Sequence, residues 1–576
     1  MTRYLVTSAL PYINGVKHLG TLIGSMLSAD VYTRYLRARG EEVIYICATD
    51  EHGTPAELAA REAGLEVAEY CRQQHEVQAD LGRRFGLSFD WFGRSSSPSN
   101  HEITHHFADE LEKHGFIYED STEQLYSLDD ERFLPDRYVV GTCPHCGYPA
   151  ARGDQCENCT RLLDPTDLID PRSAISGSTR LELRTSRHLF LRQSALADEV
   201  RAWIGTRVGW PILATSIAYK WLDEGVRDRN ITRDISWGVP VNRPGFEGKV
   251  FYVWFDAPLA YIASTKDWSE ADPTGERDWR SWWYDTDDVR YVQFMGKDNV
   301  PFHTIGFPSS ELGTREPWKM VDYLKAFNWL DYYGGKFSTS HGTGVFMNDA
   351  LELLPADYWR WYLVANAPES SDSTFTWDVF AGAVNKDLAD TFGNFVNRTL
   401  TLTARTFDSR VPESTPGEAE ERLAAELGEA VLQYEELLDA MQFRRAAHQL
   451  RAIWAAGNAY LNAEAPWKSL KDDPAKSAAT LATAVNLVRL FAILSAPIIP
   501  DTSQRTLAAL DLDGDVTSPW PLTAEEVRTA LSALSAGHRF EVPEVLFRKV
   551  TDAEAESWRE RFGGHPAQLD ASPVGS

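Results

Sequence analysis

The chain has 576 residues, of which 43% are hydrophobic and 24% charged, the balance of an ordinary soluble globular protein. It is too long for one compact core, so we expect roughly three or four domains. Its 57 basic and 84 acidic residues give a net charge of −27, which argues against broad non-specific binding to nucleic acid. We identify no apolar run long enough to cross a bilayer and no signal peptide, so no membrane partner and a cytoplasmic location are expected.

Two buried strands are predicted near the start of the chain, over residues 4–9 and 43–48. A loop over residues 10–17 follows the first strand, and a helix then runs to about Arg39, where Gly40 ends it. This order of strand, loop, helix and strand is a βαβ unit. It implies a parallel sheet with a ligand site at the carboxyl ends of its strands.

An irregular segment over residues 115–240 separates this unit from two further predicted strands, over residues 249–254 and 289–295. The simplest interpretation is one nucleotide-binding sheet that is split by an inserted domain. From about residue 385 the apolar residues recur at spacings of three, four and seven, which places them on one face of long helices. This pattern predicts a helix bundle.

Four of the six cysteines lie in the inserted segment as two Cys-x-x-Cys pairs, Cys143 with Cys146 and Cys156 with Cys159. Four thiolates at this spacing suit a tetrahedral Zn²⁺ ion and leave no position for water, so a structural site with one zinc ion per chain is predicted. His145 lies inside the first pair and could compete as a ligand, but the four cysteines already satisfy the ion. The alternative is four cysteines that are free or form disulfides.

Two short motifs carry candidate catalytic residues. In PYINGVKHLGT, residues 11–21, His18 lies near a helix N-terminus that favours phosphate. In GGKFSTSHG, residues 334–342, Lys336 lies in a glycine-flanked loop that can fold over a triphosphate and meet the charge of departing pyrophosphate. Taken alone, the first motif fits an ordinary loop equally well, and the second fits a solvated turn better than a catalytic loop.

Together, the two motifs resemble the signature motifs of class I aminoacyl-tRNA synthetases. Seven stretches are similar to the methionyl-tRNA synthetase family, in the order of that family, and cover residues 3 to about 550. They are SALPYINGVKHLG, CATDEHGTPAE, LPDRYVVGTCPHC, ITRDISWGVPV, FYVWFDAPLAYI, FMGKDNVPFH and NAEAPWK. The resemblance implies an α/β fold, with a class I Rossmann-type nucleotide-binding domain split by a zinc-bearing insertion and followed by an α-helical anticodon-binding bundle.

The resemblance also implies domain boundaries. They are 1–115 and 241–325 for the two halves of the Rossmann domain, 116–240 for the insertion with the zinc knuckles, 326–384 for a linking region with the lysine loop, 385–545 for the helical domain and 546–576 for the C-terminal segment. No further domain is expected, and we expect a monomer.

The activity implied by the family is ATP-dependent activation of L-methionine to methionyl-adenylate, followed by transfer to initiator and elongator tRNA(Met). Mg²⁺ is expected to accompany ATP. The implied methionine-binding residues are Ala9, Leu10, Tyr12, Asp50, Trp254, Ala257, Pro258, Tyr261 and His303. The implied ATP-binding residues are His18, Gly20, Thr21, Gly296, Asp298, Lys336 and Ser338, with His18, Thr21 and Lys336 as the catalytic residues. The implied anticodon-binding residues are Asn397, Arg398, Pro466 and Trp467.

In this scheme Asp50 and the Leu10 carbonyl hold the substrate ammonium, and aromatic and small apolar groups enclose the thioether. Without the resemblance, Trp254 and Tyr261 fit a packed strand-to-helix corner, and Trp467 fits a core residue that caps the bundle.

The motifs depart from the common family pattern at two positions. Thr21 stands where His or Asn is usual, and Thr339 stands where a second Lys is usual. A loss of one cation weakens transition-state stabilisation and puts the catalytic rate in question. Two other functions therefore stay open: a paralogue that adenylates methionine or another amino acid without charging tRNA, and a non-catalytic RNA-binding protein.

Overall fold

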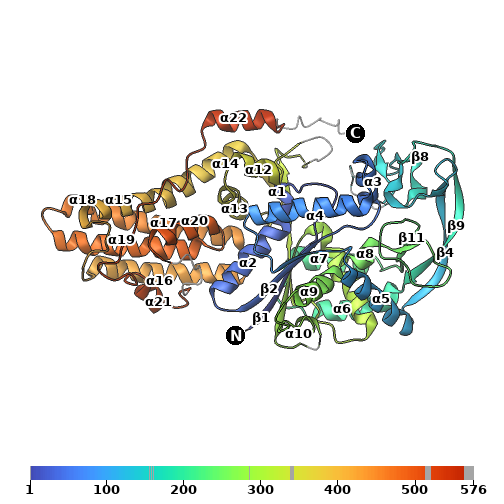
Figure 1. Cartoon of the computed structure of the whole chain (residues 1–576), viewed down its shortest axis with the longest axis horizontal. Coiled ribbons are helices and arrows are strands. Elements are labelled where there is room, and N and C mark those ends of the chain that lie inside the picture. Colours follow the sequence, from blue (N-terminus) through green and yellow to red (C-terminus); the bar gives the residue numbers. More distant parts are fainter. Residues whose placement is uncertain are drawn as a thin grey trace, which may run out of the picture.

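The computed structural model describes residues 2–154, 156, 158–159, 161, 163–284, 286–335, 337, 343–512 and 520–563. In these residues a parallel sheet occupies the middle of an elongated molecule, with an antiparallel arm at one end and a bundle of helices at the other (Figure 1). This arrangement confirms the predicted fold class, an α/β domain split by an insertion and followed by an α-helical bundle.

The central sheet has five strands in the order β14-β13-β1-β2-β3, and every neighbouring pair is parallel. The bounds are β1 Arg3–Ser8, β2 Glu42–Thr49, β3 Trp91–Arg94, β13 Val289–Gly296 and β14 Tyr323–Phe327. The predicted strands at residues 4–9, 43–48 and 289–295 are confirmed as β1, β2 and β13. Because all carboxyl ends of a parallel sheet face one edge, the loops after these strands come together there.

The segment between β1 and β2 is a loop followed by a helical stretch, as predicted. The stretch consists of α1 Leu19–Thr21, a π-helical turn at Leu22–Met26 and α2 Leu27–Ala38. Gly40 has a φ of +81°, so it takes the left-handed conformation that commonly ends a helix. Three further helices follow β2 and β3: α3 Thr54–Glu62, α4 Val67–Arg84 and α5 Pro98–Lys113.

The antiparallel arm is built on two long strands, β4 Ile117–Ser127 and β9 Leu181–Leu191, which pair over their whole length. The short strands β5 Arg132–Phe133 and β10 Arg229–Asn230 extend the arm at its edges. Its end carries a separate three-stranded sheet of β6 Val139–Thr142, β7 Ala151–Arg152 and β8 Ile169–Ser173. Helices α6 Gln193–Gly205 and α7 Ile212–Asp223 lead back towards the central sheet.

Residues 249–254 do not form a strand of the central sheet, so that prediction is wrong. Only Val250–Phe251 form a strand, β12, which pairs antiparallel with β11 Thr232–Arg233. Val253–Asp256 form the short helix α8. A short apolar run fits a buried helix as well as a strand, because its composition does not separate the two. Helices α9 Ala260–Glu270, α10 Arg280–Trp283 and α11 Phe307–Thr314 complete this part of the chain.

A linking region and the helix bundle make up the other half of the molecule. The linking region contains β15 Leu330–Tyr332, α12 Met347–Leu353, α13 Ala356–Ala365, β16 Ser373–Phe375, α14 Trp377–Ala383 and a π-helical segment at Val384–Gly393. The bundle contains α15 Asn394–Phe407, α16 Glu418–Asp439, α17 Phe443–Glu464, α18 Pro466–Ser469, α19 Pro474–Ser495, α20 Pro500–Ala509 and α21 Ala524–Ala530, and α22 Asp552–Arg561 packs back on α14.

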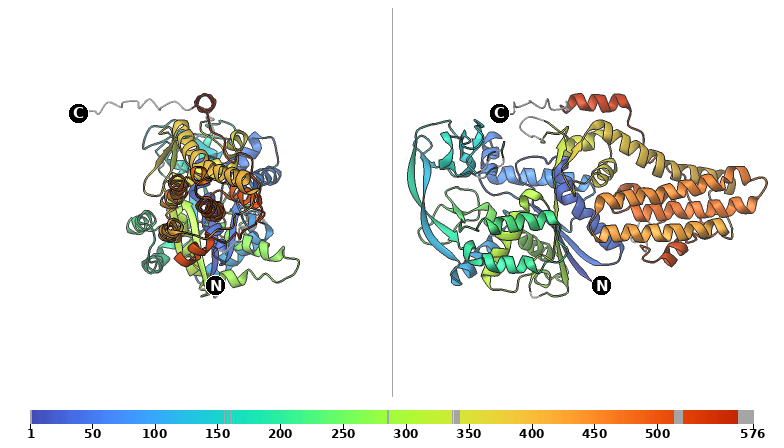
Figure 2. Two further views of the ribbon diagram at one scale, coloured as in Figure 1. Left: turned by 90° about the vertical axis from the view of Figure 1, so that its left-hand side faces the viewer. Right: turned by 180° about the vertical axis from the view of Figure 1, so that it is seen from behind.

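The predicted apolar helix faces, for example at Leu388, Leu427 and Val485, are buried in this half. Helix α17 was not predicted, although Leu450 and Trp454 give it a buried face of the same spacing. One hydrophobic cluster continues from the α2 side of the sheet through α13 into the bundle. The view from behind shows the bundle extending from the sheet on the side opposite the arm (Figure 2).

One helix in the described part of the chain, α19, is long and apolar enough to cross a membrane, which corrects the expectation that no such run exists. Of the residues in its most apolar stretch, 94% are buried inside the protein. Burial of this kind is typical of a core helix, because a membrane span would present its apolar side chains to lipid.

Candidate active site

The loops after β1 and β2 are joined by backbone hydrogen bonds at the carboxyl edge of the sheet. The amide of Asp50 donates to the Pro11 carbonyl at 2.9 Å, and the amide of Ile13 donates to the Asp50 carbonyl at 2.9 Å. Tyr12 lies opposite Asp50 in this bridge, and 47% of the Tyr12 side chain is exposed. The fold therefore brings together two predicted site residues that are 38 positions apart in the sequence.

The Asp50 carboxyl is buried without a full set of partners. Only 6% of the residue is exposed, and no described residue forms a hydrogen bond with Oδ1. Burial, together with the nearby Asp256 and Glu51, raises the pKa of Asp50 well above its usual value, while Lys17 opposes the rise. A carboxylate in such a place is costly unless a cation pairs with it, so the site is suited to a positively charged ligand group.

A polar network that the sequence analysis did not identify lies next to Asp50. His52 Nδ1 and Asp256 Oδ2 are 2.7 Å apart and both side chains are buried. Asn100 donates to the same Asp256 oxygen at 3.3 Å. Arg94 donates two hydrogen bonds of 2.9 Å to the buried Glu51. In the sequence, the only signal for this network is the run of polar residues Asp50, Glu51 and His52 after β2. Their partners come from elements that are distant in the chain.

Aromatic side chains from α8, α9 and the π-helical turn Phe302–Gly306 form a second wall. The ring centroids of Trp254 and Phe302 are 4.6 Å apart. His303 Nδ1 lies 2.9 Å from the Asn299 carbonyl and must donate to it, so Nε2 accepts from the Tyr261 hydroxyl at 3.0 Å. Burial lowers the pKa of His303 to about 4, so this ring is neutral near pH 7.

The remaining predicted methionine-pocket residues come from the same two regions. Ala9 continues the pairing of β1, because its amide donates to the Phe294 carbonyl at 2.8 Å. Leu10 follows it and is half-buried, while Ala257 is half-buried and Pro258 is buried at the turn between α8 and α9. These positions are adjacent in the chain to Tyr12 and Trp254, which keeps them at the same edge of the sheet.

His18 lies at the start of α1 and contacts Thr21. The Thr21 amide donates to Nδ1 at 3.3 Å, and the Thr21 hydroxyl lies 3.3 Å from Nε2. Burial and the neighbouring Lys17 lower the pKa of His18 to about 4. The ring is therefore neutral near pH 7, and Nε2 carries the proton that it can donate to an anionic oxygen.

The structure brings the two signature motifs into contact. The ring of Phe337, from the second motif, stacks on the ring of His18 with centroids 4.6 Å apart and planes within 5°. The amide of Met347, after the second motif, donates to the Lys17 carbonyl at 2.9 Å. The predicted residues Lys336 and Ser338, and Thr339 beside them, lie outside the described residues.

Close approaches explain the glycines among the predicted ATP-binding residues. A side chain at Gly20 would lie 3.0 Å from the His18 ring and 3.2 Å from the Leu330 carbonyl. A side chain at Gly296, the last residue of β13, would lie 2.6 Å from the Asp298 carboxylate. Asp298 itself is exposed at the same edge of the sheet. Any larger residue at either glycine would therefore crowd this edge of the sheet.

The four predicted anticodon residues lie together at one end of the bundle. Asn397 and Arg398 are on α15, and Pro466 and Trp467 begin α18. The Arg398 guanidinium lies 5.2 Å from the centre of the Trp467 ring and donates to the Asn462 amide oxygen at 3.0 Å. Trp467 is 42% exposed, so it is not a core residue that caps the bundle. An exposed ring and a cation form a surface on which an unstacked base can bind.

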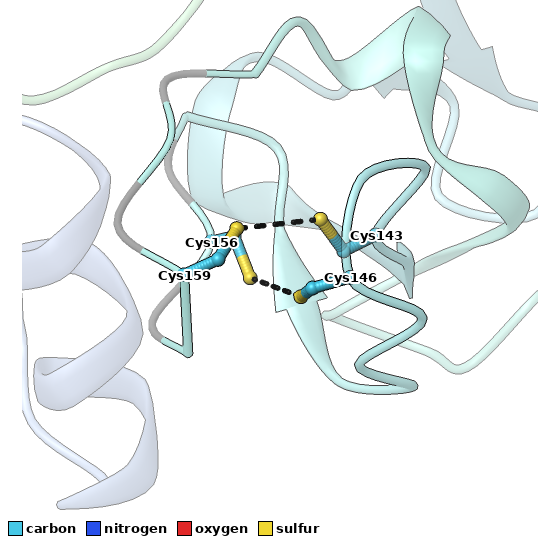
Figure 3. Close-up of side chains that lie close together, drawn as sticks. All are labelled: Cys143, Cys146, Cys156 and Cys159. Carbon is cyan, nitrogen blue, oxygen red and sulfur yellow. Dashed lines mark hydrogen bonds between the residues drawn. The ribbon is translucent and has the colours of Figure 1, made fainter. Parts of the chain in front are cut away.

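The four predicted cysteines form one cluster after β6 and β7 (Figure 3). Cys143 Sγ lies 3.8 Å from Cys159 Sγ, and Cys146 Sγ lies 3.6 Å from Cys156 Sγ. Tetrahedral zinc with bonds of about 2.3 Å requires sulfur atoms about 3.8 Å apart, so the cluster could hold a zinc ion. His145 is directed to Arg161, 3.2 Å from its Nη1, and is not part of the cluster.

Comparisons with known proteins agree with this geometry. A family model described as tRNA synthetases class I (M) matches residues 4–400, and one described as the anticodon binding domain of methionyl tRNA ligase matches residues 411–567. A solved structure of the Mycobacterium tuberculosis methionyl-tRNA synthetase in complex with methionyl-adenylate has the same fold. Its TM-score is 0.74 at 24% identity, over 95% of this chain and 100% of that one.

Curated relatives are much closer in sequence. The methionine–tRNA ligase of Streptomyces avermitilis is 59% identical over 98% of this chain and 100% of its own length. The methionine–tRNA ligase of a Ruegeria species is 59% identical over 98% of this chain and 99% of its own. Because the matches run through the sheet, the insertion and the bundle, the chain belongs to the methionine–tRNA ligase family of class I aminoacyl-tRNA synthetases.

Proposed function

We propose that the chain activates L-methionine with ATP at the carboxyl edge of its parallel sheet and then transfers the methionyl group to tRNA(Met). The observation that carries this proposal is the Asp50 carboxyl, which is buried, has an oxygen without a partner among the described residues, and lies beside the loop after β1 and near Asp256 of α8. An amino acid offers both the ammonium group that this carboxyl needs and a side chain for the aromatic wall.

Methionine binds with its ammonium on Asp50 and the Leu10 carbonyl. Its thioether lies among Trp254, Ala257, Pro258, Tyr261 and His303, with Ala9 and Tyr12 beside it. The neutral His303 ring and the Tyr261 hydroxyl satisfy each other at 3.0 Å, so the pocket presents little unpaired polarity to an apolar side chain. Sulfur is polarizable and packs favourably against aromatic rings, which suits this lining.

ATP binds across His18, Gly20 and Thr21, with Gly296 and Asp298 at its ribose and with Lys336 and Ser338 over its phosphates. Mg²⁺ enters with ATP because the phosphate oxygens need a hard divalent cation. His18 Nε2 and the Thr21 hydroxyl lie 3.3 Å apart, and both can donate hydrogen bonds to the phosphates of a bound ATP. The stacking of Phe337 on His18 links the lysine loop to this donor pair.

The reaction needs no covalent intermediate with the enzyme. A methionine carboxylate oxygen attacks the α-phosphorus, the bond to the β-phosphate oxygen breaks, and pyrophosphate leaves. A ribose hydroxyl at the 3′ end of the tRNA then attacks the methionyl carbonyl carbon and loses its proton to the departing phosphate or to water, and AMP leaves with the bonding electrons. Alignment of the reactants and stabilisation of phosphate charge supply the catalysis in both steps.

The exposed Trp467 with Arg398 favours tRNA charging over a synthetase that adenylates amino acids alone. An enzyme without a tRNA substrate has no need of an aromatic platform at the far end of a helix bundle. We also propose that the protein acts in the cytoplasm as a monomer and that initiator and elongator tRNA(Met) are both substrates. The residue boundaries of its domains stay predictions.

The proposed function is tested by two assays on the purified protein. We expect methionine-dependent exchange of pyrophosphate into ATP, and charging of tRNA(Met) with labelled methionine. Trp467→Ala should lower charging at limiting tRNA by about tenfold, the worth of one stacked base, and leave exchange unchanged. Leu522→Ala, a similarly exposed apolar residue before α21, serves as the control. Exchange without charging would favour the adenylating enzyme instead.

We also propose that the four cysteines hold a structural zinc ion. Four thiolates fill a tetrahedral shell, so the ion cross-links the chain after β6 to the chain after β7 and offers no position to substrate. Hydrogen bonds from the Tyr148 backbone and the Asn158 side chain lower the pKa of the Cys146 thiol to about 6, which favours the thiolate form that binds metal.

Metal analysis should find about one zinc ion per chain, bound through sulfur. Cys146→Ser should reduce the zinc content and increase proteolysis of the arm, whereas Cys71→Ala, a buried cysteine outside the cluster, should keep the zinc. If the zinc-free protein keeps the same proteolytic pattern and the same charging rate, the structural role is wrong.

A further inference from the structure

A buried hydrogen-bonded pair joins the two sides of the proposed methionine pocket. His52, in the loop after β2, and Asp256, the last residue of α8, have side chains that are 1% and 0% exposed, and Nδ1 and Oδ2 are 2.7 Å apart. Because the carboxylate accepts, Nδ1 carries the proton. Asp50 lies two residues before His52, and Trp254 lies two residues before Asp256. The pair therefore connects the segment with the proposed ammonium ligand to the segment with part of the aromatic wall.

The two segments are otherwise anchored to different parts of the fold. Asp50 is bonded through its backbone to the loop after β1, whereas Asn100 of α5 donates to Asp256 Oδ2 at 3.3 Å. In the part of the chain that the structure describes, no other hydrogen bond joins the loop after β2 to α8. The His52–Asp256 pair is therefore the direct polar link between the two sides of the pocket.

Stability alone explains this pair poorly. Desolvation of a buried charged pair cancels much of its attraction, and apolar residues of similar volume often serve a fold equally well. Burial raises the pKa of Asp256, and His52 opposes this rise. Asp256 in turn contributes to the raised pKa of Asp50. The fold thus bears the cost of a second buried carboxyl beside the proposed ammonium ligand, a cost that suits a group which fixes the geometry of a site.

An amino acid in this pocket must be held at two ends at once. Its ammonium binds Asp50, and the end of its side chain packs against the wall that includes Trp254 and Ala257. An apolar pocket by itself separates side chains that differ by one methylene only about 10-fold to 200-fold. The distance between the ammonium ligand and the wall therefore decides how much of this discrimination is realised.

We propose that the His52–Asp256 pair positions Asp50 relative to α8 and thereby selects the length of the amino-acid side chain that the pocket activates. His52 and Asp256 are positioning residues, because they act on the substrate through Asp50 and through α8. This inference rests on the proposed function. It adds the substrate class of the pocket, an α-amino acid with an unbranched side chain of the length of methionine. Norleucine has this length, norvaline is shorter and ethionine is longer.

The test measures amino-acid preference in His52→Ala, which removes the pair, and in His52→Asn, whose amide nitrogen can replace Nδ1 as a donor to Asp256. Pyrophosphate exchange gives kcat and KM for the four amino acids and KM for ATP. In His52→Ala we expect the preference in kcat/KM for methionine over norvaline and ethionine to fall at least about fivefold, mainly through KM. Norleucine should keep its ratio to methionine, and KM for ATP should stay within about twofold. His52→Asn should regain most of the preference.

His188→Ala is the matched control. The His188 side chain on β9 is also fully buried and lies 3.2 Å from a carboxylate, that of Asp234, but this pair belongs to the arm and not to the pocket. Its removal should lower stability and leave the preference among the four amino acids unchanged.

Calorimetric binding of the same amino acids without ATP needs no catalysis and separates the two proposals. A parent protein that binds methionine selectively but shows no exchange contradicts only the proposed activity, and one that binds none of the four overturns both. Unchanged preference in His52→Ala would overturn the inference. An equal loss for all four amino acids would do the same, because the pair would then only support the fold. If His52→Ala does not fold, His52→Gln, whose donor lies farther along the side chain, is judged by the same two criteria.

Discussion

Arg360→Met is expected to lower the free energy of unfolding by about 3–5 kcal/mol, because it removes one partner of a buried ion pair. Arg360 lies on α13, and its side chain and that of Asp30 on α2 are both fully buried, with Nη2 and Oδ2 2.7 Å apart. The guanidinium also donates to the carbonyls of Pro497 at 3.0 Å and Ile498 at 2.8 Å. It therefore joins α2 to the turn between α19 and α20.

The pH dependence of this pair follows from Asp30. Burial alone would raise its pKa, but Arg34 and Arg360 lower it from 3.8 to about 2. The stabilisation is therefore complete above about pH 4, where the unfolded chain is ionised, and is lost as the pH falls towards 2. Urea unfolding at pH 7 and at pH 3 should show a larger effect of Arg360→Met at pH 7.

Two controls make this prediction specific. Arg34→Gln also removes a partner of Asp30, at 2.9 Å, but Arg34 is 24% exposed, so water can replace it and a smaller loss is expected. The double variant Arg360→Met with Asp30→Leu should regain part of the stability, because no buried charge is left unpaired. Equal unfolding midpoints for Arg360→Met and the parent would show that the pair does not stabilise the junction.

The strands of the sheet and the loops that follow them can be predicted from the sequence better than the contacts between distant segments. Local patterns sufficed for β1, β2 and the loop with His18, because an apolar run followed by glycines and a helix is a local signal. The same reasoning placed Trp254 on a strand, although it lies on α8. The apolar run around it does not contain the information that separates a buried helix from a strand.

Long-range polar pairs could not be predicted in this way. His52 and Asp256 are 204 positions apart, and Asp30 and Arg360 are 330 positions apart. Each pair exists because the fold brings together elements that are far apart in the chain, the loop after β2 with α8 and α2 with α13, and no periodicity in the sequence encodes such a contact. The stacking of Phe337 on His18 belongs to the same class, although the resemblance of both motifs to one family implied that they meet.

Asp50→Asn is expected to lower kcat/KM for methionine by about 2–4 kcal/mol, roughly 30-fold to 1,000-fold, because the substrate ammonium loses its charged partner. The variant should at the same time stabilise the ligand-free protein. The pKa of Asp50 is raised well above 3.8, mainly by burial, so the unfolded chain releases this proton at lower pH than the folded chain does.

The free-energy cost of burying the ionised Asp50 is therefore absent below about pH 4 and grows as the pH rises above it. Asn has no ionisable group, so Asp50→Asn does not have this cost. Thermal unfolding should show a higher midpoint for Asp50→Asn at pH 7 and equal midpoints near pH 4. Steady-state exchange should show the loss in the KM for methionine, whereas Asp298→Asn should act on the KM for ATP. If Asp50→Asn weakens both substrates equally and also lowers the unfolding midpoint at pH 7, Asp50 supports the fold and does not bind the amino acid.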